Sequence, residues 1–87
     1  MKIKRNIALS DSGFVFNPTT GDSFSTNPIG LEIIRLLKED KDAEQVKKHV
    51  IQHYMTDEVT FEKDYYDFVN MLTKLQLIEA DDNQAQD

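Results

Sequence analysis

The sequence contains no cysteine, and it has only three glycines and two prolines among its 87 residues. Without cysteine the chain can form no disulfide, thiolate zinc site or iron–sulfur cluster, and it has no cysteine nucleophile. No apolar run approaches the roughly 20 residues of a membrane-spanning helix, and the N-terminus lacks the apolar stretch of a signal peptide. We therefore expect a cytoplasmic protein with no membrane association.

Positive charge is also scarce, since 10 Lys and Arg residues stand against 16 Asp and Glu residues, for a net charge of −6. Proteins that bind nucleic acid normally present clustered Lys and Arg to the phosphates. Acidic residues concentrate instead in residues 57–67 and 79–87. Nucleic acid is therefore not an expected ligand, whereas a peptide with basic residues suits these charges.

The length is that of one small domain. Hydrophobic residues make up 39% and charged residues 30% of the chain, as in ordinary globular domains. After Leu77 and Ile78 the sequence has nothing apolar to bury. We predict one domain over residues 1–78, followed by a disordered acidic tail over 79–87.

The first third of the chain has the pattern of strands and turns. Residues 3–9 alternate apolar and polar side chains, and residues 13–17 and 22–26 are short aromatic or polar runs. Turn residues, with Gly13 and Gly21 among them, separate the three segments. These patterns predict a three-stranded antiparallel sheet whose outer strands have open edges.

The rest of the chain predicts three helices, near 28–37, 43–54 and 58–76. Asn27, Asp42 and Asp57 stand where helix N-caps are expected, and Pro28 suits a first turn. The last helix has one apolar stripe at helical spacing, formed by Phe61, Tyr65, Phe68, Leu72 and Leu75. The expected fold is α+β and winged helix-turn-helix-like, although here the strands precede the helices.

Several segments resemble a known family in their order and spacing. They are Gly-Phe-Val-Phe at 13–16, Thr-Gly-Asp-Ser-Phe at 20–24 and Asn-Pro-Ile-Gly at 27–30, with single matches at Ile33, Leu36, Leu37, Val46, Tyr54, Asp57, Glu62, Asp64, Phe68, Leu72, Leu77 and Ile78. Over residues 5–78 the chain resembles the PqqD-like peptide chaperones. These are also called recognition elements for ribosomally synthesised, post-translationally modified peptides.

The resemblance implies a non-enzymatic domain that binds the leader segment of a precursor peptide. It implies presentation of that peptide to a modifying enzyme, often of the radical S-adenosylmethionine class. Two residues depart from the family pattern, Thr26 in place of a larger apolar residue and Gln76 in place of a helix-ending glycine. We expect Gln76 to use a different C-cap geometry or a strained left-handed conformation. Gly30, inside the first helix, is expected to allow close packing.

The expected binding groove lies between the last strand and the last helix. The strand would offer its unpaired backbone groups to an extended peptide, and the helix would form the other wall. One flank of this helix carries Val69 and Tyr66, and the opposite flank carries Asp64, Asp67 and Met71. Choosing the more apolar flank gives a predicted peptide site of Asp22, Ser23, Phe24, Ser25, Thr26, Asn27, Glu62, Tyr65, Tyr66, Val69 and Thr73.

No catalytic, metal or cofactor site is predicted. His49 and His53 are spaced to chelate a metal, but the chain has no further histidine to serve as a third ligand. The carboxylates of residues 57–67 favour the helix dipole, and so small a core leaves no deep cleft for catalysis.

Three alternatives remain open. A DNA-binding winged helix would need a basic face, but Lys47 and Lys48 are accompanied by Glu44, and the last helix is acidic. A general protein–protein adaptor would differ only in the nature of its partner. The open strand edge also permits a homodimer.

Overall fold

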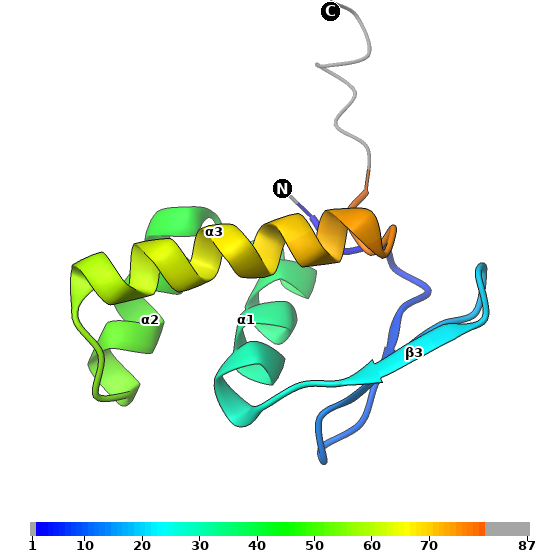
Figure 1. Cartoon of the computed structure of the whole chain (residues 1–87), viewed down its shortest axis with the longest axis horizontal. Coiled ribbons are helices and arrows are strands. Elements are labelled where there is room, and N and C mark those ends of the chain that lie inside the picture. Colours follow the sequence, from blue (N-terminus) through cyan, green and yellow to red (C-terminus); the bar gives the residue numbers. More distant parts are fainter. Residues whose placement is uncertain (1, 80–87) are drawn as a thin grey trace, which may run out of the picture.

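The computed structural model describes residues 2–79. Three strands, β1 (Ala8–Leu9), β2 (Phe14–Asn17) and β3 (Asp22–Ser25), form an antiparallel sheet in the order β1-β2-β3. Three helices follow, α1 (Pro28–Lys38), α2 (Ala43–His53) and α3 (Glu58–Lys74). In Figure 1, α3 lies across α1 and α2, and the sheet lies beside the last turns of α3. The predicted fold class, a three-stranded antiparallel sheet followed by three helices, is confirmed.

The first predicted strand is wrong in extent. β1 covers only Ala8–Leu9, and a turn at Arg5 and Asn6 separates it from Ile3. Ile3 instead forms an isolated antiparallel bridge with Ile78. The apolar residues at the start of the chain are therefore buried against two different partners, which produces a strand-like pattern without one continuous strand.

The predicted helix caps are present. The Asn27 side chain accepts the Gly30 N–H at 2.8 Å, and the Asp57 side chain accepts the Thr60 N–H at 2.7 Å. This bond holds the pKa of Asp57 below its usual value. Asp42 caps α2 reciprocally with Gln45, in a capping box.

Helix α3 ends before the predicted limit, at Lys74. Gln76 has φ 62° and thus adopts the left-handed conformation, one of the two alternatives expected for it. The Leu77 N–H donates to the Leu72 carbonyl at 3.0 Å, and the Gln76 N–H donates to the Thr73 carbonyl at 3.0 Å. This is a Schellman ending with glutamine at the position that usually holds glycine.

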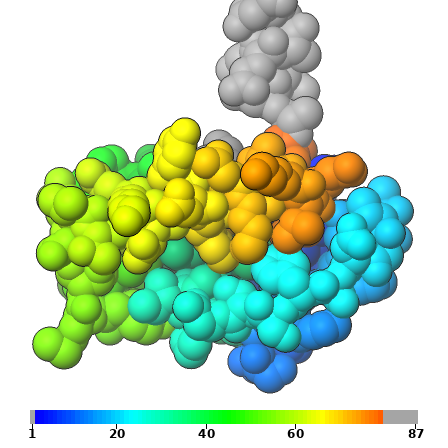
Figure 2. All heavy atoms as spheres, viewed as in Figure 1, coloured from blue at the N-terminus to red at the C-terminus, as the bar shows by residue number. Residues whose placement is uncertain are grey.

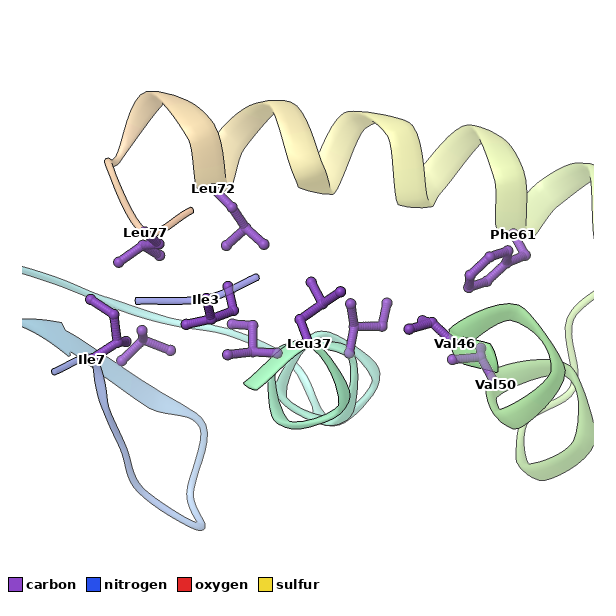
Figure 3. Packing of buried hydrophobic residues seen from close by; sticks show 11 residues of the cluster. Ile3, Ile7, Leu37, Val46, Val50, Phe61, Leu72 and Leu77 are labelled. Carbon is purple, nitrogen blue, oxygen red and sulfur yellow. The ribbon is translucent and has the colours of Figure 1, made fainter. Parts of the chain in front are cut away.

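The core forms one layer between α3 and the elements beneath it (Figure 3). Phe61 lies over Val46 and Val50, and at the other end Leu72 and Leu77 lie over Ile3 and Ile7. Of the predicted stripe on α3, Phe61 and Leu72 are buried, whereas the other three are partly buried and packed against the core: Tyr65, Phe68 and Leu75.

The predicted acidic tail lies outside the described residues, apart from Glu79. The Glu79 N–H donates to the Lys2 carbonyl at 2.7 Å, next to the bridge between Ile3 and Ile78. None of the helices within residues 2–79 combines the length and the hydropathy needed to cross a membrane.

Candidate functional site

Strand β3 is an edge strand, and within residues 2–79 its outer side has no strand partner. The Thr26 N–H donates to the Gly13 carbonyl at 2.8 Å, and β2 and β3 continue in the same antiparallel register. Backbone groups in such a ladder alternate between the two sides of a strand. Phe24 therefore directs its N–H and C=O toward β2, whereas Ser23 and Ser25 direct theirs to the open edge.

A hollow of about 210 Å³ lies beside the chain as it leaves β3. Further along α3, Figure 2 shows the segment that holds β3, drawn in cyan, against the second half of the helix, drawn in gold to orange. Most of the lining is apolar, with an amide, a hydroxyl and a carboxylate among it. We call this the α1–α3 hollow; it is lined by Asn27, Ile29, Gly30, Ile33, Val50, Thr56, Phe61, Asp64, Tyr65 and Phe68.

Gly30 allows α1 to approach the wall of this hollow. A Cβ at this position would overlap the Thr26 hydroxyl oxygen and would lie 3.3 Å from Cε1 of Phe68. It would also lie 3.2 Å from Oδ1 of Asn27, the oxygen that caps the helix. The close packing expected of this glycine is therefore present, and a larger residue would require the Thr26 side chain and the Phe68 ring to shift.

The flank of α3 that faces this hollow carries Asp64 and Phe68. Met71 lies seven residues, about two helical turns, beyond Asp64 and shares its flank. Its side chain is 36% exposed. This flank of α3 thus combines an aromatic ring, a thioether and a carboxylate.

The predicted peptide-site residues fall in two places. Those from Asp22 to Asn27 lie on β3 and its exit, and Tyr65 lines the α1–α3 hollow. Glu62, Tyr66 and Val69 instead line a second hollow on the other side of α3. Thr73 is exposed, and its hydroxyl donates to the Val69 carbonyl at 2.9 Å.

The second hollow measures about 280 Å³ and lies between α2 and α3. We call it the α2–α3 hollow; its lining is Ala43, Glu44, Lys47, Phe61, Glu62, Tyr65, Tyr66 and Val69. The more apolar flank of α3 therefore faces α2 rather than β3, because α2 packs on that side. The β3 side carries the flank with Asp64 and Met71, which the sequence also showed but which contains fewer apolar residues.

Tyr65 lines both hollows. Its hydroxyl oxygen is buried and has no hydrogen-bond partner among the described residues. Burial raises the pKa of this hydroxyl, and the charge of Asp42 at the start of α2 raises it further. A buried phenol without a hydrogen-bond partner is unfavourable, so this hydroxyl lowers the stability of the fold.

The two histidines lie side by side on α2. The His49 Nε2 lies 2.7 Å from a carboxylate oxygen of Glu32, which joins α2 to α1. The ring of His53 stacks on that of His49 with a centroid distance of 4.2 Å. In the described part of the chain, no three His, Asp or Glu side chains form a group that could hold a metal ion.

Comparison with known proteins identifies a family and a solved structure that share these elements. A family model described as coenzyme PQQ synthesis protein D (PqqD) matches residues 13–78. The chain belongs to the PqqD family. The match begins at Gly13, whose carbonyl accepts the N–H of Thr26 just after β3, and it ends at Ile78, so it includes β2, β3 and all three helices.

A solved structure, TbiB1 in complex with the TbiA(beta) leader peptide, is similar to this PqqD-family chain with a TM-score of 0.81 and 31% sequence identity. The similarity covers 93% of this chain and 100% of TbiB1. No match was found among the curated proteins.

Proposed function

We propose that this chain binds the leader segment of a ribosomally synthesised precursor peptide and holds it for a modifying enzyme. The observation that carries the proposal is the open edge of β3 beside an apolar hollow. The similarity to TbiB1, whose structure contains a leader peptide, supports it.

The leader would add a fourth strand to the sheet. Ser23 and Ser25 would each offer one N–H and one C=O to its backbone, a mode of binding that requires no particular peptide sequence. Side chains alternate along an extended peptide, so every second one would turn toward α3. There Phe68 and Met71 would select apolar side chains.

Charge adds a weaker preference. Asp64 lies at the hollow, and Asp67 follows it on the solvent side of the same flank. A basic residue of the leader would be attracted to these carboxylates. Because both are exposed, the attraction contributes little to affinity and weakens with salt.

The role is one of binding and presentation, without catalysis or a cofactor of its own. The partner enzyme that we propose is a peptide-modifying enzyme, with the radical S-adenosylmethionine class as the first candidate. DNA binding is disfavoured because Lys47, on α2, has its Nζ within 3.4 Å of three carboxylates. A salt-sensitive retention on heparin would reverse this preference.

The test is a titration of ¹⁵N-labelled protein with the leader peptide encoded beside its gene, followed by amide hydrogen exchange. We expect shifts at residues 22–27, 64, 68 and 71. The outward N–H groups of Ser23 and Ser25 should exchange rapidly in the free protein and become protected in the complex. The N–H of Phe24, already paired with β2, should change little. Protection confined to other elements, or no response at saturating peptide, would disprove the proposal.

A further inference from the structure

The α2–α3 hollow lies on the side of α3 away from the open edge of β3, and the proposed leader site does not use it. Its floor is apolar, with Ala43 from α2 and with Phe61 and Val69 from α3. Tyr66 stands at its rim with 68% of its surface exposed. Large aromatic side chains are enriched at protein–protein contacts, because they supply area with few rotatable bonds.

The rim of this hollow is negative. The Nζ of Lys47 lies 3.3 Å from a carboxylate oxygen of Glu44 and 3.4 Å from those of Glu58 and Glu62. One ammonium group therefore stands among three carboxylates, all of them more than half exposed. The surplus charge is available to cations from outside, so the chemistry around the apolar floor suits a basic partner.

The aromatic rings give the floor its area. Tyr65 belongs to the lining, and its ring stacks on that of Phe61 with a centroid distance of 5.3 Å. An apolar side chain from a partner would fill the floor against these rings. The acidic rim and the apolar floor thus suit a basic segment that carries one apolar side chain.

We propose that the α2–α3 hollow docks the peptide-modifying enzyme through a basic segment that inserts one apolar side chain between α2 and α3. The identification of this partner as the modifying enzyme rests on the proposed function. Because leader and enzyme would contact opposite flanks of α3, they would bind together rather than compete. The helix would hold the peptide on one side and the enzyme on the other.

The recognition chemistry is tested with short synthetic probes. Acetyl-Lys-Leu-Arg-amide, titrated into ¹⁵N-labelled protein, should shift the amides of Ala43, Lys47, Tyr66 and Val69. Acetyl-Glu-Leu-Glu-amide lacks the cations, and acetyl-Lys-Ser-Arg-amide lacks the apolar side chain, so both should shift these amides far less. Equal responses to all three probes, or shifts centred on Gly30 and Phe68, would overturn the assignment.

The partner is tested with the purified modifying enzyme encoded beside this gene. Val69→Arg places a charge in the floor, and Val59→Arg makes the same change at a site on α3 that is 78% exposed. We expect Val69→Arg to weaken enzyme binding at least tenfold and Val59→Arg to leave it unchanged. If Val69→Arg melts early, Tyr66→Ser, at the exposed rim, serves in its place.

Leader affinity, measured on the same variants, separates this proposal from the proposed function. Retained leader binding with lost enzyme binding supports docking in the hollow. If the unaltered protein does not bind the leader, the proposed function alone is refuted, because the enzyme titration does not need the leader. Equal enzyme affinity of the Val69 and Val59 variants would refute the docking site. So would enzyme contacts at the exposed rings of Phe14 and Phe16 on the outer face of the sheet.

Discussion

Replacement of Ser25 by proline tests the open edge of β3 directly. Proline has no N–H, so Ser25→Pro removes one donor from the edge that we expect the leader to use. Proline is tolerated on edge strands when the missing N–H faces outward. The neighbouring contact between Thr26 and Gly13 does not involve Ser25 and should remain.

The expected magnitude follows from one hydrogen bond. Such a bond contributes about 0.5–1.5 kcal/mol net, so the dissociation constant for the leader should rise roughly 2- to 12-fold. The free energy of unfolding should change by no more than about 1 kcal/mol, since no bond within the sheet is lost. Ser25→Ala is the matched control because it removes the hydroxyl and keeps the N–H.

The assay is fluorescence anisotropy with a labelled leader peptide, accompanied by thermal melting of each variant. Equal affinity of the proline and alanine variants would show that the Ser25 N–H makes no bond to the leader. A melting temperature lowered by many degrees only in Ser25→Pro would show that this N–H belongs to the ladder with β2. Either result would refute the edge geometry argued above.

Three further predictions concern stability. Leu72→Ala should lower the free energy of unfolding by about 2–5 kcal/mol in urea denaturation, because Leu72 is fully buried; a loss below about 1 kcal/mol would mean that the core is misplaced. Gln76→Gly should raise the melting temperature, with a gain of about 1 kcal/mol, because glycine relieves the φ of 62°; a lower melting temperature would contradict this. The N–H of Thr60 holds the pKa of Asp57 low, so this carboxylate stabilises the fold above its unfolded pKa of about 3.9 and loses the effect as pH falls through the lower folded value. Asp57→Asn, which can still cap the helix, should therefore lose less stability than the wild type between about pH 5 and pH 2, and parallel losses would contradict this.

Local chemistry explains why most of the elements could be predicted. Each helix begins at a residue whose side chain accepts a nearby N–H, and such caps depend only on neighbours in sequence. The two glycines with positive φ, Gly13 and Gly21, mark the two hairpin turns for the same reason. The left-handed conformation of Gln76 is likewise a property of one helix end.

The prediction of the first strand was wrong in extent because the residue that pairs with Ile3 is distant in the sequence. Ile3 pairs with Ile78 at the far end of the described chain, and an alternating pattern does not say which segment provides the second strand. A period of two in apolar residues is therefore compatible with one long strand or with two short contacts. Only the tertiary contacts distinguish one long strand from two short contacts.

The sequence by itself determined the order of strands and helices, the family, and an open last strand with two unlike flanks on the last helix. Only the tertiary structure decided which flank faces that strand. Periodicity reports how side chains are distributed around a helix axis, but the positions of neighbouring elements are set by packing between distant segments. Here α2 packs beside Val69 and Tyr66, whereas the flank with Asp64 and Phe68 faces the start of α1, where the chain leaves β3.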